Sequence, residues 1–114
     1  MRDTAAYKVL TADELAELES GSFAGSADDK RDGYIHLSTA AQLTETVDKH
    51  YAGTTGLWVA EVDLDALGDA IRWEPSRGGQ DFPHLYAALP LDAVVAYSPL
   101  DRDDDGAVKL PVTG

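Results

Sequence analysis

Two short segments of this chain share one frame, in which an apolar residue, a histidine, a leucine and a polar residue follow one another. They lie within residues 34–38 and residues 82–86. Successive side chains of an extended strand point to opposite faces, so each segment can bury one face in a core and present its imidazole on the other. The residues that these faces would present are Tyr34, His36 and Ser38 in the first segment and Phe82, His84 and Tyr86 in the second.

The size and composition of the chain are those of a small globular protein. It has 114 residues, of which 44% are hydrophobic, and we expect a single domain over residues 1–114. No apolar run approaches the ~20 residues that cross a bilayer, and the first residues lack the apolar stretch of a signal peptide. We therefore expect a cytoplasmic protein without a membrane partner. The absence of cysteine excludes disulfides and cysteine-ligated zinc.

Acidic residues outnumber basic residues in this chain. The 21 aspartates and glutamates against 9 lysines and arginines give a formal net charge of −12. An extended nucleic acid would meet a repulsive field, so we predict no such partner. A small anionic ligand is compatible with this charge, because local donors such as Arg72 outweigh distant charges that saline screens over about 8 Å. The sequence names no protein partner.

Capping residues and apolar spacing predict the remaining elements. Thr11 with Glu14 marks the start of a helix that runs to residue 20. Thr39 with Gln42 marks the start of a second helix. Residues 21–33 are rich in Gly, Ser, Asp and Lys, and we expect a mobile loop there that could serve as a lid. The other expected strands are residues 5–10, 57–62, 71–74 and 94–97, with a short edge strand at 108–112.

This order of elements favours an α+β domain with a mostly antiparallel or mixed sheet and two main helices. The glycine-rich motifs of dinucleotide domains and P-loop enzymes are absent, as is the nucleophile elbow of serine hydrolases. His36, His84 and a carboxylate could form a metal-binding set. Because no diagnostic motif such as His-Glu-x-x-His is present, we predict no metal.

His36 is the first candidate for ligand chemistry. Ser38 shares its predicted strand face, and Ser38 or Thr39 stands at a helix start whose free N–H groups can receive a phosphate or ribose oxygen. The alternative is a structural histidine, with the two hydroxyl residues serving only as helix caps. His84 presents the same choice, since Pro83 and the flanking aromatic residues could belong to a structural crossing.

Glu74 is the candidate carboxylate. It follows Trp73 in a predicted strand, and the neighbouring Arg72 would favour its ionised form. The alternative is a solvated glutamate with no role, which is the common state of glutamates in proteins.

Blocks along nearly the whole chain resemble a small bacterial family, the domain of unknown function 952. The resemblance is carried by residues 7–11, 32–39, 72–74, 82–86 and 89–91. Membership implies a fold similar to that of the ADP-ribosyltransferases, whose split sheet holds NAD in a central cleft. The His36-Leu37-Ser38 block is also similar to a motif of the RNA 2′-phosphotransferases that helps to bind NAD.

The resemblance implies roles for individual residues. His36 and Ser38 would contact the nicotinamide or its ribose, and Glu74 would hold a ribose hydroxyl and stabilise an oxocarbenium-like transition state. Lys8 stands in the opening strand, where relatives of this fold often have histidine, and its ammonium can donate to a ribose hydroxyl. The aromatic residues available to stack on the nicotinamide ring are Tyr34, Phe82 and Tyr86.

The leading hypothesis is a cleft that binds NAD or another nucleotide-like small molecule, with His36 and Glu74 as catalytic residues in ADP-ribosyl transfer or cleavage of the nicotinamide glycosidic bond. The predicted ligand-binding residues are Lys8, Tyr34, Ser38, Thr39, Arg72, Phe82, His84 and Tyr86. One alternative is a non-catalytic module that uses the same pocket for a small metabolite or a protein. Another is a protein in which both histidines only stabilise the fold.

Overall fold

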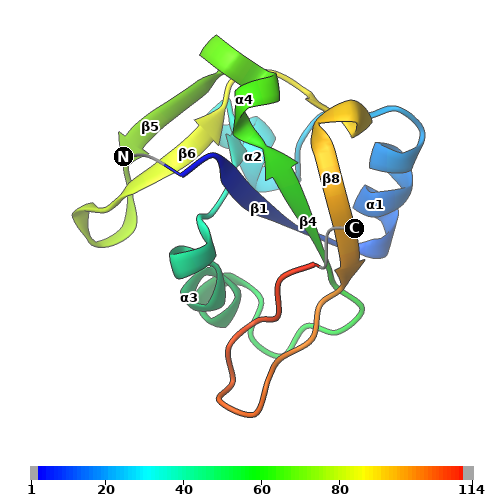
Figure 1. Ribbon diagram of the computed structural model, residues 1–114, viewed down its shortest axis with the longest axis vertical. Helices are drawn as coiled ribbons and strands as arrows, with labels where there is room; N and C mark the ends of the chain where they lie inside the picture. The colour runs from blue at the N-terminus through cyan, green and yellow to red at the C-terminus, as the bar shows by residue number, and fades with distance from the viewer. Residues whose placement is uncertain (1–2, 112–114) are drawn as a thin grey trace.

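Three antiparallel sheets organise residues 3–111, which the computed structural model describes apart from the side chain of Arg77 (Figure 1). The first sheet has the strand order β1 (Ala5–Leu10), β4 (Trp58–Asp63) and β8 (Val94–Pro99). The second has the order β3 (Ile35–His36), β6 (Asp81–Leu85) and β5 (Ile71–Pro75). The third pairs β2 (Ser22–Phe23) with β7 (Leu89–Pro90).

Helices lie between these strands along the chain. The α-helices of residues 3–111 are α1 (Ala12–Glu19), α2 (Ala27–Asp32), α3 (Ala40–His50) and α4 (Leu64–Leu67). Short 3₁₀ turns cover Gly68–Ala70, Arg77–Gly79 and Leu91–Ala93. The expected α+β class and antiparallel pairing are therefore confirmed, and α1 and α3 are the two main helices.

Both helix starts predicted from capping residues are confirmed. At α1, the Glu14 N–H donates to Thr11 Oγ1 at 3.2 Å, and the Thr11 N–H donates to Glu14 Oε1 at 2.9 Å. At α3, the Thr39 N–H donates to Gln42 Oε1 at 3.0 Å. These side chains satisfy N–H groups that a helix start leaves without an intrahelical acceptor.

The prediction of a loop over residues 21–33 is wrong, because this stretch contains β2 and α2. Ser26 and Asp29 form a capping box at the start of α2, and Gly33 ends the helix with a φ of 88°. Phe23 is fully buried and anchors β2 in the core. A polar composition concealed these elements because α2 has a single buried side chain, and that side chain is charged.

The expected edge strand at residues 108–112 is also wrong over the part that the structure describes. Val108 pairs only with Arg102, in an isolated bridge. Pro111 has no N–H to continue such a ladder, which fits the absence of a strand up to residue 111. Val112 lies outside the described residues.

A single bridge joins the two larger sheets. The Tyr7 N–H donates to the Ser38 carbonyl at 2.7 Å, and the Ser38 N–H donates to the Tyr7 carbonyl at 3.0 Å. These two hydrogen bonds form an antiparallel bridge between Tyr7 of β1 and Ser38, which lies two positions beyond the end of β3. It places Lys8 of β1 beside His36 of β3.

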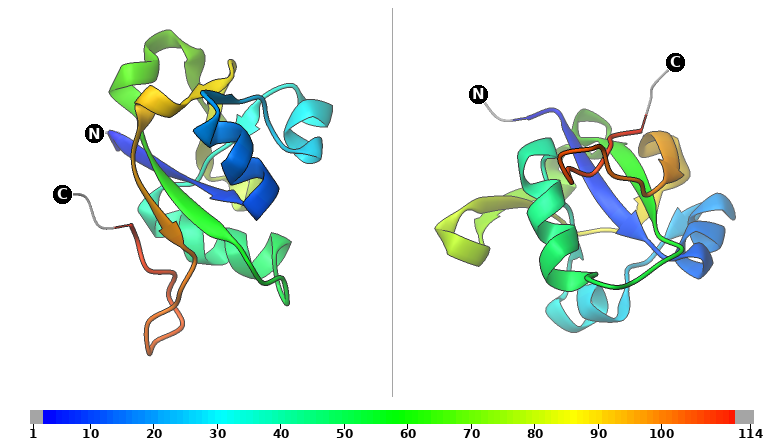
Figure 2. Two further views of the ribbon diagram at one scale, coloured as in Figure 1. Left: turned by 90° about the vertical axis from the view of Figure 1, so that its right-hand side faces the viewer. Right: turned by 90° about the horizontal axis from the view of Figure 1, so that it is seen from below.

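The core lies on both faces of the β1–β4–β8 sheet. Ala6 and Leu10 of β1 belong to one buried cluster, whereas Tyr7 and Val9 belong to another. The two views of Figure 2 show α3 on one side of β1 and α1 on the other. Lys8 alternates with Tyr7 and Val9, so it shares the face of Ala6 and Leu10 and is itself buried.

Between residues 3 and 111, no helix combines the length and apolar character needed to cross a bilayer.

Candidate functional site

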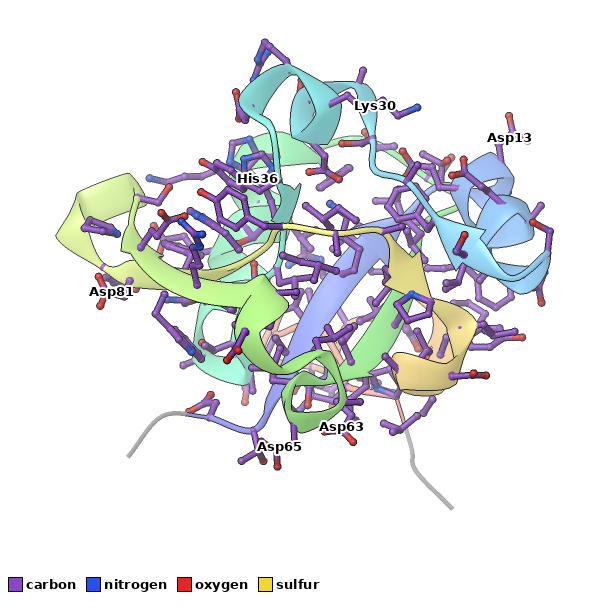
Figure 3. The ribbon with its side chains drawn as sticks, turned by 90° about the horizontal axis from the view of Figure 1, so that it is seen from above. Asp13, Lys30, His36, Asp63, Asp65 and Asp81 are labelled. Carbon is purple, nitrogen blue, oxygen red and sulfur yellow. The ribbon has the colours of Figure 1, made fainter. Side chains whose placement is uncertain are left out.

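The two histidine segments are neighbours in the second sheet. His36 of β3 lies directly opposite His84 of β6, and His84 lies opposite Arg72 of β5. Ile35 and Leu85, the next pair in the register, are buried on the core side. The predicted alternation of the two segments is therefore confirmed. Figure 3 shows His36 on the side of its strand that faces α2.

Tyr34 lies at the centre of a cluster of rings. Its ring stacks on the His84 imidazole with centroids 4.0 Å apart and planes 20° apart. It also lies 4.8 Å from the centroid of His36 and 5.3 Å from that of Tyr86. The two imidazoles are 5.8 Å apart in an edge arrangement. Tyr34 therefore fixes the planes of both polar rings by contact.

Glu74 is bound to two members of this cluster. Its Oε1 lies 2.8 Å from His84 Nδ1 and accepts a hydrogen bond from the Tyr86 hydroxyl at 2.6 Å. Hydrogen bonds from Tyr86 and His84, aided by the charge of Arg72, lower the pKa of Glu74 although partial desolvation opposes this. The Arg72 guanidinium also lies over the Tyr86 ring, 4.8 Å from its centroid. An ionised carboxylate only accepts, so Nδ1 of His84 is the protonated nitrogen in this pair.

His36 is held differently, between two carboxylates of α2. Its Nδ1 lies 2.6 Å from Asp29 Oδ1, and its Nε2 lies 2.9 Å from Asp32 Oδ2. Both contacts are hydrogen bonds only when both ring nitrogens carry protons, which is the imidazolium form. The chain thus supplies a carboxylate partner for each ring nitrogen of His36.

Asp29 is the residue of the site that the sequence interpretation missed. Its carboxylate is buried, lies 2.9 Å from Lys8 Nζ, and accepts the N–H groups of Ser26 and His36 at 2.9 and 3.1 Å. Burial alone would raise its pKa, but the His36 and Lys8 contacts and the Ser26 N–H hold the pKa of this carboxyl well below its usual range. The spacing of Ser26 and Asp29 was the available signal, since it matches a helix N-cap followed three residues later by an acceptor.

Lys8 is tied to the protein itself. Besides the contact with Asp29, its Nζ donates to the His36 carbonyl at 3.1 Å. An ammonium has three donors, so two are engaged within the chain and one is left for a ligand. The predicted ligand role of Lys8 is thus confined to a single hydrogen bond.

A cleft of about 720 Å³ opens beside these residues. It brings together a majority of the predicted ligand set. The predicted site residues that line it are Lys8, Tyr34, His36, Ser38, Phe82 and His84. The predicted residues outside its lining are Thr39, Arg72, Glu74 and Tyr86. Tyr86 instead lines a neighbouring hollow of about 250 Å³, to which Tyr34 also contributes.

The hydroxyl corner predicted at residues 38 and 39 is partly occupied by the chain. Ser38 Oγ lies 2.8 Å from Thr46 Oγ1, and Gln42 takes the N–H of Thr39. Ser38 lines the cleft and Thr39 does not. The N–H of Thr39 is therefore satisfied by Gln42 of its own helix, as the predicted capping pair requires.

Helices α1, α2 and α3 contribute much of the remaining cleft wall, which has mixed charge. Its acidic and basic residues are Glu14, Asp28, Asp29, Asp32, Lys8, Arg31 and Lys49. Tyr51, just after α3, adds an aromatic wall. Burial raises the pKa of Tyr51 to about 12, and nearby negative charges add to the shift. No local sequence pattern predicts this set of residues, because its members come from separate elements of the chain.

Within residues 3–111, His, Asp and Glu side chains form no group of three or more arranged to hold a metal ion.

Fold and site together define an α+β protein with antiparallel sheets and a cleft of mixed charge that is lined by His36, His50 and His84. The chain belongs to the family described as Protein of unknown function (DUF952), whose model matches residues 9–97. The family resemblance inferred from the sequence blocks is thereby confirmed.

Solved structures of a relative are similar over almost the whole chain. The crystal structure of protein CC0527 from Caulobacter crescentus has 41% sequence identity and a TM-score of 0.84, covering 93% of this chain and 94% of that chain. A solution NMR structure of CC0527 has 41% identity and a TM-score of 0.78, covering 93% and 91%. No curated protein matches the chain.

Proposed function

We propose that the cleft binds a nucleotide-type ligand such as NAD. The observation that carries this proposal is the position of His36, Ser38 and His84 on the wall of one cleft of about 720 Å³. Pockets for small molecules and cofactors fall in the range of about 300–1,000 Å³ and combine aromatic walls with a few polar groups. Tyr34 and Phe82 supply such walls here.

The same proposal extends to the fold, which we infer to be of the ADP-ribosyltransferase-like type, and to a cytoplasmic site of action. Two three-stranded antiparallel sheets joined by the Tyr7–Ser38 bridge resemble a split sheet. The cleft is lined from both sides of this junction, by Lys8 on one strand and His36 on the other. A ligand between the two sheets would contact the histidine-leucine-serine block directly.

Titration calorimetry with NAD, ADP-ribose and nicotinamide tests the binding proposal. His36→Ala removes an imidazole from the cleft wall and leaves Asp29 and Asp32 without this partner, which should weaken binding by about ten- to a hundredfold. Glu19→Gln serves as a matched control, because Glu19 accepts a hydrogen bond from Tyr97 and does not line the cleft. Absence of binding heat for all three compounds would overturn the proposal, as would equal affinity in His36→Ala.

Catalysis is the second part of the proposal. We infer that the bound ligand undergoes ADP-ribosyl transfer or cleavage of its nicotinamide glycosidic bond, with Glu74 stabilising the positive charge that develops on the ribose. The ionised state of Glu74 supports this role. NAD consumption measured by loss of the intact dinucleotide should then disappear in Glu74→Gln.

A non-catalytic binding module is the second candidate. The observation that favours it is the position of Glu74, whose Oε1 is bonded to His84 and Tyr86 and which does not line the cleft. Such a module would bind its small metabolite or protein partner without turnover, and Glu74→Gln would leave its affinity unchanged. Binding of NAD without consumption in the unmodified chain selects this candidate.

A further inference from the structure

The geometry around His84 divides the roles of its two ring nitrogens. Its Nδ1 lies 2.8 Å from Glu74 Oε1, and that same oxygen accepts the Tyr86 hydroxyl at 2.6 Å. The Tyr86 bond thus holds the same carboxylate oxygen that contacts the ring. Because the Glu74 oxygen accepts a hydrogen bond from Nδ1, the ring proton lies on Nδ1. A neutral imidazole then has a lone pair at Nε2.

The surroundings of the ring keep this arrangement rigid. His84 is 2% exposed, and Tyr34 stacks on it with centroids 4.0 Å apart. The ring nevertheless contributes to the wall of the cleft. The hydrogen bond described for the His84 ring is made by Nδ1. Because no buried side-chain nitrogen or oxygen of residues 3–111 lacks a hydrogen-bond partner, an unpaired Nε2 is not sealed in the core, which fits an opening onto the cleft that the ring lines.

We propose that His84 presents Nε2 to the ligand as a hydrogen-bond acceptor, and that Glu74 and Tyr86 are its positioning residues. This assignment deepens the proposed function and rests on it for the identity of the ligand. Glu74 sets the tautomer of His84 in this arrangement, in addition to the electrostatic role proposed for its charge in catalysis.

His36 makes the assignment selective, because it has the opposite character. Its two nitrogens face Asp29 and Asp32, so it is a donor on both sides. The centroids of the two imidazoles are 5.8 Å apart, and because the chain engages both nitrogens of His36, the nitrogen left for a ligand is that of His84.

The ligand group that meets His84 must therefore carry an O–H or N–H donor. A ribose hydroxyl or a carboxamide satisfies this requirement, whereas a carboxylate or phosphate oxygen would place its lone pairs against that of Nε2. A buried acceptor left without its donor should weaken binding by about five- to 150-fold, enough to discriminate between the two kinds of group.

Long-range ¹H–¹⁵N NMR of the full chain separates protonated from unprotonated ring nitrogens and tests the tautomer without any ligand. At about pH 8, above the ordinary pKa of imidazole, His84 should have a protonated Nδ1 and an unprotonated Nε2. Glu74→Ala removes the acceptor and should move the proton to Nε2 in most molecules. Glu74→Gln retains an amide oxygen at the same place and should restore the Nδ1 proton.

Glu19→Ala is the control, since Glu19 binds Tyr97 as Glu74 binds Tyr86 but has no histidine beside it. It should leave the His84 signals unchanged. Tyr86→Phe provides a second variant, in which the Nδ1 proton should persist with a broader signal because the carboxylate is held less firmly. A proton on Nε2 in the unmodified chain would overturn the assignment whatever the chain binds.

Addition of ADP-ribose or NAD tests the part that depends on the ligand. Binding should shift the Nε2 signal in the direction of an accepted hydrogen bond while Nδ1 keeps its proton. Binding that leaves Nε2 unchanged contradicts the role of His84 alone. If neither compound binds, the proposed function and the ligand contact fail together, whereas the tautomer remains decided by the spectrum of the free chain.

Discussion

At the scale of single residues, Asp29 connects three parts of the chain. Its buried carboxylate contacts Lys8 on β1, His36 on β3 and the backbone at Ser26, where α2 begins. Two charges removed from water repay their desolvation only when they stay paired and hydrogen-bonded. Asp29 therefore joins β1, β3 and α2 at the wall of the cleft.

Replacing Asp29 tests this dependence. Asp29→Asn leaves the Lys8 ammonium buried without its counter-ion and should lower the free energy of unfolding by about 3–5 kcal/mol, measured by urea denaturation. Asp28→Asn, one position earlier, removes an exposed pair with Arg31 and should cost at most about 1 kcal/mol. An equal decrease in the free energy of unfolding in the two variants would show that the buried pair contributes no more to stability than the exposed pair.

The lowered pKa of Asp29 also predicts a dependence of stability on pH. A carboxyl whose pKa is lower in the folded than in the unfolded chain stabilises the fold above its ordinary value, here 3.8. This contribution is lost as the pH falls from 3.8 towards the folded-state pKa. The Asp29 carboxyl carbon, followed by NMR, should therefore remain in its ionised state at pH 3.8. Half-protonation at that pH in the folded chain would contradict the prediction.

At the scale of elements, α2 is a short helix whose position depends on its two ends. Ser26 and Asp29 cap its start, and Gly33 follows its last residue in the left-handed region. Six residues are too few for a stable helix in isolation, so caps and tertiary contacts supply its stability. Because Asp29 and Asp32 both belong to α2, its ends determine where the partners of His36 lie.

Gly33 provides the test at this scale. Gly33→Ala should lower the free energy of unfolding by about 1 kcal/mol, because an L-residue with a side chain is strained at this φ of 88°. A Cβ at this position meets no atom within 4 Å, so the cost is one of backbone conformation rather than contact. Gly33→Asn should cost less, since asparagine tolerates the left-handed region. Equal stability of all three chains in thermal melts would argue against this cause.

At the scale of the whole molecule, the β1–β4–β8 sheet has a buried cluster on each face. Leu18 of α1 belongs to one cluster and Leu43 of α3 to the other. Both are essentially inaccessible to solvent. The cleft lies at the junction of this sheet with β3, so both clusters support its walls.

Substitutions in both clusters test whether they stabilise one structure. Leu18→Ala and Leu43→Ala should each lower the free energy of unfolding by about 2–5 kcal/mol. The double variant should show the sum to within about 0.5 kcal/mol, because the two residues share no cluster. Leu110→Ala, at an exposed leucine, should change stability by less than about 0.5 kcal/mol. Separate transitions by circular dichroism and tryptophan fluorescence would indicate two units that unfold independently.

Local sequence patterns are sufficient to predict the features that depend on residues close to one another in the chain. The alternation around His36 and His84 predicted their strands and faces, because strand geometry repeats every two residues. The starts of α1 and α3 followed from Thr11 and Thr39, since a cap and its partner are three residues apart. The same logic applied to Ser26 would have found α2, but its polar composition favoured the prediction of a loop.

The site itself depends on contacts between distant segments, which no local pattern contains. The partners of His36 come from α2, and Lys8 reaches Asp29 only because the Tyr7–Ser38 bridge brings β1 beside β3. The sequence identifies Glu74 and His84 as candidate site residues. Their hydrogen bond and the position of Glu74 outside the cleft depend on the register of β5 with β6. Periodicity thus determines which side chains share a face, whereas long-range pairing and burial determine which of them meet and which remain free to bind a ligand.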